Sequence, residues 1–330
     1  MPIIYESLIS MITLSCCEGL GRPQDLLIGN NTNKQTVVHA SAETQSKLRN
    51  RLVPIPGGFF DMGCRQSTFP DDNDSPSRKV YVSPFLISPH AVSNADFATF
   101  VDQTGYQTIA EREGGSFVFQ SFLSDLTAYP NFARTAPWWR YVDGAFWSAP
   151  EGPDSNVDQL QNHPVTHIAW YDAMAYCQWS GLRLPWEAEW EFAARGGLSR
   201  KKFPWGNQLV PKGKYVMNTW QGDFPKLNTE DDGWHGTAPV DAFPPNGFGL
   251  FNMTGNVWEW VQDFYGTRPP SKRLPDRDPK GPVKGMQRIQ RGGSYLCHKS
   301  YCDRYHVHSR IPSDPINSAG HSGFRVSCNP

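Results

Sequence analysis

Apolar positions in this chain occur in short groups separated by proline and glycine, and few stretches carry a helical period. Residues 79–87 (KVYVSPFLI) alternate between polar and apolar side chains, which predicts a strand. The segment NADFATFVDQ repeats at the helical period and precedes Gly105. It predicts a helix that begins after Ser93 or Asn94 as its N-cap and ends at that glycine.

Two more helices are predicted in the middle of the chain. One covers residues 172–179 and ends before Gly181, and the other begins at Pro185 and runs through WEAEWEFAAR to Gly196 and Gly197. Beyond that point little periodic structure is evident, although apolar and aromatic residues stay frequent. This combination indicates irregular backbone that is held by something besides hydrogen-bonded ladders, such as metal ions.

The composition favours a loop-rich α+β fold with little regular secondary structure. The 330 residues include 29 glycines, 28 prolines and 12 tryptophans, so the core is expected to rely on aromatic rings rather than on long helices. The formal net charge is −1, and no basic stripe is present. Nucleic acid and anionic membranes are therefore excluded as partners on electrostatic grounds.

The N-terminal residues pose a separate question. Residues 1–18 contain the apolar run LISMITLSCC, which has the length of a secretory signal and is too short for a membrane span of ~20 residues. We predict a signal peptide, although no Lys or Arg precedes the run. A bacterial lipoprotein signal ending at Cys16 or Cys17 and a misassigned start are the alternatives. Residues 19–51 are polar and predict a linker, with the folded domain over residues 52–330.

Cys297 and Cys302 stand in the segment RGGSYLCHKSYCDRY. Their C-x4-C spacing is at the outer limit for half of a zinc site, and the sequence has no second cysteine pair at such spacing. Only a turn would bring the two sulfurs together. A structural disulfide and a reactive or metal-binding pair both satisfy the spacing. Two thiolates without an evident imidazole would suit Cu(I), and His298, Lys299 and Arg304 would favour the thiolate form if they lie close.

Four segments resemble the formylglycine-generating enzyme (sulfatase-modifying factor) family in order and spacing: APWWRYVDGAFWSAPEGPDS, LPWEAEWEFAARGG, GTAPVDAFPPNGFGLFNMTGNVWEW and RGGSYLCHKSYCDRY. The resemblance extends from about Val53 to the C-terminus. GNVWEW and GFRV are shared with inactive paralogues, whereas the two cysteines of GGSYxCHxSYC are typical of active members. The resemblance implies one calcium-stabilised, loop-rich catalytic domain over residues 52–330, with C-type lectins as distant relatives.

The same resemblance implies a copper-dependent oxidase. Cys297 and Cys302 would hold Cu(I), and the cysteine of a C-x-P-x-R segment in an unfolded sulfatase would join as a third sulfur ligand. Dioxygen and a thiol reductant would then convert that cysteine to Cα-formylglycine. Ser294 and Tyr301 would lie beside the sulfurs, and Trp258 would form part of the pocket wall. Without copper, the two cysteines can close into a disulfide.

Two calcium sites are also implied by the resemblance, where oxygen-rich loops fail the EF-hand template. In NTWQGDFPKLNTEDDGW, the first site would use the side chains of Asn218 and Asp232 and the carbonyls of Thr219 and Trp234. In FNMTGNVWE, the second site would use the side chains of Asn252 and Glu259 and the carbonyls of Gly255 and Val257. A solvated acidic turn is the alternative for the first loop.

Departures from the family pattern concern the other cysteines and one histidine. Ala194 and Val307 occupy the positions of one cysteine pair of close relatives, as expected of one lost disulfide. Cys328 is an alternative disulfide partner for Cys177, and Cys64 has no evident disulfide partner. His321 stands where many members have asparagine, just before the terminal GFR segment.

His163 and His167 are interpreted as structural histidines. His163 and His167 have the H-x3-H spacing of a metal pair, but Pro164 argues against a helix interior there. His306 and His308 lie near the cysteine segment and are not assigned as ligands.

Other functions on this scaffold remain as alternatives. A non-catalytic sulfatase-binding paralogue would lack one or both cysteines, and an iron-dependent sulfoxide synthase would need a further domain. Carbohydrate binding rests on fold analogy alone. We expect residence in the secretory pathway, in the lumen of the endoplasmic reticulum, with a bacterial exported or lipoprotein form as the alternative.

Overall fold

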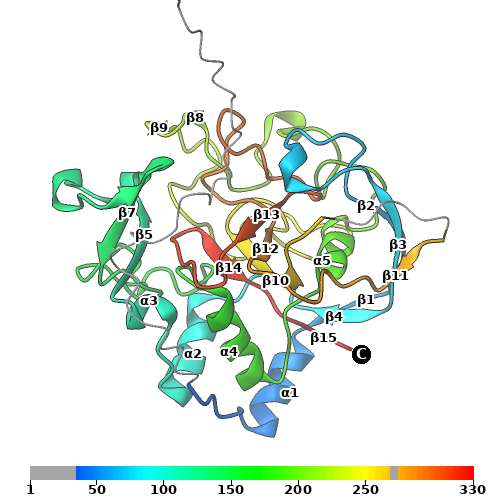
Figure 1. The fold of residues 1–330 in the computed structure, drawn as a ribbon, viewed down its shortest axis with the longest axis horizontal. Helices are drawn as coiled ribbons and strands as arrows, with labels where there is room; N and C mark the ends of the chain where they lie inside the picture. Colours follow the sequence, from blue (N-terminus) through cyan, green and yellow to red (C-terminus); the bar gives the residue numbers. More distant parts are fainter. Residues whose placement is uncertain (1–34, 268–273) are drawn as a thin grey trace, which may run out of the picture.

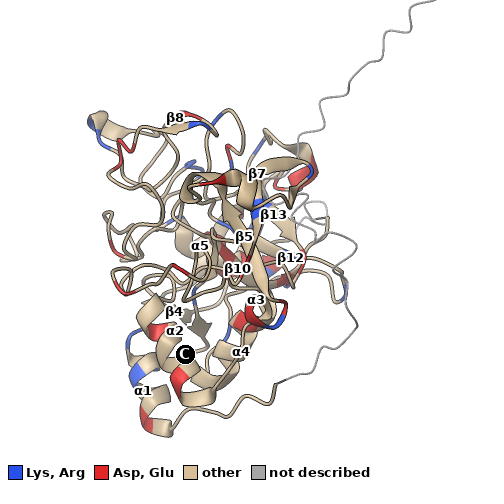
Figure 2. Ribbon diagram, turned by 90° about the vertical axis from the view of Figure 1, so that its left-hand side faces the viewer, with Lys and Arg blue, Asp and Glu red and all other residues tan. Residues whose placement is uncertain are grey.

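The computed structural model describes residues 35–267 and 274–330 (Figure 1). The signal peptide predicted over residues 1–18 lies outside these residues. Among the described helices, none has the length and apolar character that crossing a membrane requires. Figure 2 shows basic and acidic residues interspersed along the ribbon rather than gathered by sign.

The helices are short. The α-helices of the described residues are α1 (Ala42–Asn50), α2 (Asn94–Thr104), α3 (Ile109–Arg112), α4 (Trp170–Ser180) and α5 (Glu187–Ala194). The 3-10 helices are η2 (Pro70–Asp72), η3 (Gln120–Phe122), η4 (Leu126–Ala128) and η5 (Pro211–Gly213). Helix α2 confirms its prediction, because Ser93 accepts a hydrogen bond from the backbone N of Asp96 and Gly105 ends the helix with a φ of 64°.

The other two predicted helices are present with different ends. Helix α4 begins at Trp170, before the predicted start, and ends at Gly181 with a φ of 68°. Helix α5 begins at Glu187 rather than at Pro185. The reason is that Trp186 is its N-cap and donates its backbone N–H to the carboxylate of Glu189 at 2.9 Å.

The prediction of a polar linker over residues 19–51 is wrong for the part that the structure describes. Helix α1 forms there because Ser41 caps it by accepting a hydrogen bond from the backbone N of Thr44 at 3.2 Å. Val37 is only 6% exposed and packs in the same core cluster as the side chains of α4. The folded domain therefore begins before residue 52.

The central sheet carries the site. Its strands, in spatial order, are β13 (Arg310–Ser313), β12 (Arg288–Arg291), β10 (Trp258–Phe264) and β14 (Ser322–Phe324). Strand β10 is antiparallel to β12 and parallel to β14. Figure 1 shows this sheet in the middle of the molecule, with α2 and α4 below it and α5 beside it. The loop from β12 to β13 contains both cysteines of the predicted pair.

Smaller sheets surround the centre. They are β1 (Val53–Ile55), β4 (Phe85–Ile87) and β15 (Ser327–Cys328); β11 (Asp276–Arg277), β3 (Arg78–Val82) and β2 (Gly58–Met62); β5 (Gly115–Phe119), β7 (Ala136–Asp143) and β6 (Phe132–Ala133); and β8 (Gly222–Asp223) with β9 (Leu227–Asn228). The single strand predicted over residues 79–87 is therefore wrong, since β3 and β4 belong to different sheets. Pro84 lies in the break and has no N–H to donate to a ladder.

Aromatic rings make up much of the core, as the composition predicts. The fully buried side chains include Trp139, Trp179, Trp190, Trp258 and Trp260. Each fully buried large apolar side chain contributes about 1.5–3 kcal/mol to the free energy of unfolding. Short helices and strands are thereby held together by ring packing.

A network of buried charges lies between α5 and the central sheet. The guanidinium of Arg291 bonds Glu187 at 2.8 Å and Glu191 at 2.7 Å, and all three side chains are at most 6% exposed. Arg310 bonds Glu187 at 2.6 Å, and Arg195 bonds Glu191 at 2.7 Å. Each carboxylate therefore lies between two guanidinium groups, as buried charges require.

The network also holds backbone segments that have no regular structure. The carboxylate of Glu191 accepts the backbone N–H of Gly63 at 2.6 Å, and Arg291 donates to the carbonyl of Val307 at 2.8 Å. Beside it, Arg304 bonds the carboxylate of Asp72 at 2.5 and 3.1 Å. These contacts hold the turn after β2, the end of η2 and the cysteine loop against one another.

Replacing Arg291 tests how much the fold depends on this network. We expect Arg291→Met to lower the free energy of unfolding by about 3–5 kcal/mol, because it leaves buried carboxylate charge without its cation. The control is Lys47→Met, which breaks an ion pair with Glu43 whose side chains are 74% and 77% exposed, and which should cost less than ~1 kcal/mol. Urea unfolding monitored by tryptophan fluorescence measures both; equal losses would contradict the assignment.

Candidate active site

The cysteine loop leaves β12 through Gly292 and Gly293, whose φ angles are 95° and 77°. A Cβ on Gly293 would lie 2.8 Å from the carbonyl oxygen of Arg304, so glycine is required both by the left-handed backbone and by this close approach. The contact draws the start of the loop against its later part.

A tight turn within the loop brings the two sulfurs together. The carbonyl of His298 accepts the backbone N–H groups of Tyr301, Cys302 and Asp303 at 2.9–3.0 Å. As a result, the Sγ atoms of Cys297 and Cys302 are 2.8 Å apart, and the residues are 1% and 0% exposed. This separation exceeds the ~2.05 Å of a disulfide, so the sulfurs are in contact without being bonded. The turn expected from the spacing is thus present.

A narrow pocket lies beside this pair. It is lined by Trp138, Trp139, Phe224, Ser294, Leu296, Cys297, Tyr301 and His321. Of the residues predicted for the catalytic site, Cys297, Ser294 and Tyr301 line the pocket, and Cys302 is joined to it through the sulfur contact.

Trp258 is not among the side chains that line this pocket. Its side chain is fully buried in the core cluster that also contains both cysteines. The position in β10 explains this, because its backbone N–H donates to the carbonyl of His321 at 2.8 Å and its strand pairs with β14. Trp258 supports the site from the core.

An aromatic wall that the sequence did not predict forms one side of the pocket. The ring of Phe224, in the turn between β8 and β9, stacks on that of Tyr301 with centroids 4.5 Å apart and an angle of 7°. Trp138 of β7 contacts both rings edge-on, at 5.3 Å from Phe224 and 4.7 Å from Tyr301. The Trp-Trp pair in APWWRYVDG was the available signal, but its side-chain direction depends on the pairing of β7.

Ser294 and His321 form the polar part of the pocket. The Oγ of Ser294 is 3.5 Å from the Nδ1 of His321, and its backbone N–H donates to the Sγ of Cys297 at 3.4 Å. The imidazole of His321 packs edge-on to Trp139, with centroids 4.5 Å apart. The substitution noted in the sequence therefore faces the pocket directly.

The basic neighbours of the cysteines have partners of their own. Arg304 is balanced by the carboxylate of Asp72. Burial lowers the pKa of His298, so its ring is neutral at pH 7, and Lys299 is exposed. Neither Arg304 nor His298 therefore supplies the uncompensated positive charge that was expected to favour the thiolates.

Two residues of the first predicted calcium set, Thr219 and Trp234, contact a third, Asp232. Its carboxylate accepts the backbone N–H groups of Thr219 at 2.9 Å and Trp234 at 3.0 Å. The amide nitrogen of Gln221 lies against Asp232 and against the carbonyl and hydroxyl oxygens of Thr219. The Oδ1 of Asn218 is buried without a hydrogen-bond partner in the described part of the chain. These oxygens suit a hard cation.

The second predicted set fits only in part. Asn252 has a buried Oδ1 that makes no hydrogen bond within the described residues, and Gly255 packs closely on the carbonyl of Asn218. Val257, the residue before β10, is also buried. The carboxylate of Glu259, however, is already bound by Arg325 at 2.6 and 2.7 Å and by Trp190 at 2.7 Å. Its charge is balanced within the protein, which argues against its predicted ligand role.

Cys177, Cys328, His163 and His167 occupy structural positions. Cys177 and Cys328 are both thiols here, and Cys328 accepts a hydrogen bond from Arg49 at 3.1 Å, so the possible disulfide between them is not formed. His163 bonds the hydroxyl of Thr237 at 3.0 Å. His167 bonds that of Ser116 at 2.8 Å, and burial lowers its pKa to about 3.

The positions of one missing cysteine pair are filled by apolar side chains. Ala194 and Val307 are both fully buried in the same core cluster, as expected where packing has replaced a disulfide.

Comparisons with known proteins agree with this architecture. The solved structure of PvdO from Pseudomonas aeruginosa superimposes with a TM-score of 0.60 at 23% identity, over 84% of this chain and 94% of that one, which shows a shared fold. Residues 38–330 match the Sulfatase-modifying factor enzyme 1-like domain.

Two relatives are much more similar in sequence. The formylglycine-generating enzyme of Thermomonospora curvata is 51% identical over 291 residues, which cover 86% of this chain and 95% of that protein. The formylglycine-generating enzyme of Mus musculus is 50% identical over 281 residues, covering 84% and 75%. The chain therefore belongs to the formylglycine-generating enzyme family.

Proposed function

We propose that this protein is a copper-dependent oxidase that converts the cysteine of a C-x-P-x-R segment in unfolded sulfatases to Cα-formylglycine. The observation that carries the proposal is the sulfur pair of Cys297 and Cys302, in contact at 2.8 Å at the base of an aromatic pocket. The sequence identity of about 50% to formylglycine-generating enzymes supports the proposal.

The donor set fits a soft metal. Two buried cysteine sulfurs converge, and a pair of thiolates is the soft ligand set that Cu(I) prefers. When bound, copper supplies one-electron redox chemistry with dioxygen. The overall reaction consumes the substrate thiol, dioxygen and two reductant thiols, and it yields the aldehyde, hydrogen sulfide, a disulfide and water.

The residues of the chain exclude water and orient the substrate. Trp138, Phe224 and Tyr301 form an apolar wall that would receive the substrate cysteine and its neighbouring proline. On the other side, Ser294 and His321 offer a hydroxyl and an imidazole within 3.5 Å of each other. They would hold a water molecule or the polar atoms of the substrate beside the sulfurs.

Calcium is part of the proposal for the loops around Asn218 and Asn252. Each has a buried amide oxygen without a hydrogen-bond partner in the described chain, which is the state that a bound cation would relieve. Asp232, Thr219 and Trp234 would complete the first set. A secretory location, with a signal peptide over residues 1–18, belongs to the same proposal.

A non-catalytic paralogue that binds sulfatases is the alternative. It would need only a peptide-binding surface, so nothing would require two buried sulfurs to meet at a turn. The retention and geometry of Cys297 and Cys302 favour the oxidase.

The central test is turnover of a C-x-P-x-R peptide by the copper-loaded protein with oxygen and a thiol reductant. We expect aldehyde formation by mass spectrometry in the unaltered chain and only background in Cys297→Ser and in Cys302→Ser. Cys328→Ser is the matched control, because its thiol lies outside the pocket, and it should retain turnover. No aldehyde from copper-loaded protein would refute the oxidase in favour of the binding paralogue.

The aromatic wall predicts a change in substrate binding. Phe224→Ala removes one ring of the stacked pair and should raise KM for the peptide by up to ~10-fold while kcat changes less, since an aromatic pair contributes about 0.5–1.5 kcal/mol. Phe59→Ala removes a ring that is 57% exposed and should leave both constants unchanged. A fall in kcat at constant KM would show instead that this ring acts on the chemical step.

Bound calcium should make the unfolding temperature of the protein sensitive to chelators. Calcium at about 100 times its dissociation constant should raise the unfolding temperature by several degrees, and a chelator should reverse the shift. Asn218→Ala and Asn252→Ala should each reduce the shift, whereas Asn162→Ala, at an exposed amide that bonds Asp241, should retain it. A chelator-insensitive unfolding temperature in the unaltered chain would remove calcium from the proposal.

A further inference from the structure

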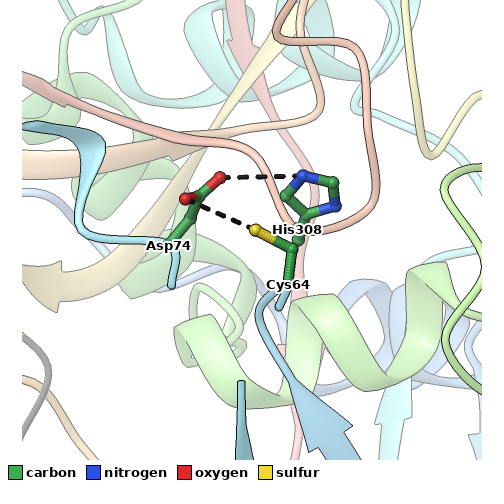
Figure 3. Close-up of side chains that lie close together, drawn as sticks. All are labelled: Cys64, Asp74 and His308. Carbon is green, nitrogen blue, oxygen red and sulfur yellow. Dashed lines mark hydrogen bonds and ion pairs between the residues drawn. The ribbon is translucent and has the colours of Figure 1, made fainter. Parts of the chain in front are cut away.

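Cys64, Asp74 and His308 lie together, apart from the Cys297–Cys302 pair (Figure 3). One ligand atom of each residue lies within 4.8 Å of the others. The Sγ of Cys64 is 3.7 Å from the Oδ1 of Asp74, and the Nε2 of His308 is 3.7 Å from the Oδ2. Three donor types that transition metals favour therefore face one point.

We propose that Cys64, Asp74 and His308 form a binding site for Zn²⁺ that is distinct from the copper cysteines. The site holds the turn after β2, the segment after η2 and the cysteine loop together. This inference does not depend on the oxidase activity.

The distances fit tetrahedral zinc. Bond lengths of about 2.0–2.3 Å to nitrogen, oxygen and sulfur place neighbouring ligand atoms about 3.3–3.7 Å apart. The two separations of 3.7 Å are at the upper end of that range, and the three ligand atoms lie within 4.8 Å of one another, so movement of the side chains toward one point would complete the geometry. Sulfur, imidazole and carboxylate together suit Zn²⁺ rather than Ca²⁺ or Mg²⁺, which take oxygen.

Charge also favours a divalent cation at this point. On binding, the thiol of Cys64 releases its proton to solvent, and the thiolate with the carboxylate of Asp74 balances the two positive charges of the ion. His308 would contribute as a neutral ring, the form in which imidazole binds metal ions. A neutral centre avoids the large cost of an uncompensated ion in a site where Asp74 is only 4% exposed.

The backbone around the ligands is held before any ion arrives. The backbone N–H of Cys64 donates to the carbonyl of Asp74 at 2.9 Å, which pairs two of the three segments. Gly63, next to Cys64, donates its backbone N–H to Glu191. The carbonyl of Val307, next to His308, accepts a hydrogen bond from Arg291. Such preorganisation lowers the entropic cost of assembling a metal site.

The site has an open side. The side chain of His308 is 15% exposed and Cys64 is partly exposed, so an ion can enter and a water molecule can fill the fourth position. The site is also linked to the catalytic loop. Arg304, between Cys302 and His308 in sequence, bonds Asp72, which lies two residues before Asp74. Zinc would therefore brace the loop that carries Cys302.

Cobalt in place of zinc gives a direct test, because a cysteine ligand produces a thiolate-to-cobalt absorption. The background is the full chain with Cys297→Ser and Cys302→Ser, which removes the copper thiols. We expect one Co²⁺ per chain with this absorption, displaced by Zn²⁺. Cys64→Ser should abolish the absorption, and Asp74→Asn and His308→Gln should each weaken binding by at least ~10-fold.

Matched controls separate the site from other thiols and carboxylates. Cys328→Ser and Asp71→Asn, an exposed acid three residues before Asp74, should leave cobalt binding unchanged. Persistence of the thiolate absorption in Cys64→Ser, or its absence in the parent background, overturns the proposal.

A second measurement needs no variant and so does not depend on whether a variant folds. Zn²⁺ should slow alkylation of Cys64 in the unaltered chain by at least ~10-fold, as read from the modified peptide by mass spectrometry, and a chelator should restore the rate. An alkylation rate of Cys64 that is the same with and without Zn²⁺ refutes the site, whatever the outcome of the turnover assay.

Discussion

The buried ion network around Arg291 is the constraint on which the rest of this structure depends. Glu187 and Glu191 come from one short helix, while Arg291 and Arg310 come from the two strands that flank the cysteine loop. Charges this deeply buried are tolerable only when every member is paired, so the helix and the two strands have little freedom to slide. The network thus sets the relative position of elements that are too short to do so by themselves.

That rigidity is what the cysteine loop requires. A loop with little ladder pairing loses much conformational entropy on folding, and the loss must be offset by contacts at its ends and middle. Here Gly293 packs on the backbone of Arg304, Arg304 bonds Asp72, and Val307 is held by Arg291. Two buried sulfurs can then lie in contact without a covalent bond between them, ready to share one ligand.

The sequence predicted the parts of the fold that local chemistry determines. The helix between Ser93 and Gly105 and the turn that joins the two cysteines follow from capping and spacing. The aromatic wall could not be predicted, because Trp138 and Phe224 are distant in sequence and meet Tyr301 only through tertiary packing. The same limit applies to Glu259, whose position in FNMTGNVWE suggests a ligand although Arg325 neutralises it.

The Cys297–Cys302 pair and the Cys64 cluster differ in a way that bears on metal selection. The pair is almost completely buried and consists of sulfur alone, whereas the cluster is partly exposed and mixes sulfur, nitrogen and oxygen. The soft sulfur pair would favour Cu(I), and the mixed ligands of the Cys64 cluster would favour an ion of intermediate softness such as Zn²⁺. The two metals therefore need not compete, although one loop contributes ligands to both sites. His308 belongs to the loop of Cys302, and Asp74 lies two residues after Asp72, which binds Arg304. Zinc bound at the Cys64 cluster would therefore reduce motion of the Cys297–Cys302 pair without contacting its sulfurs.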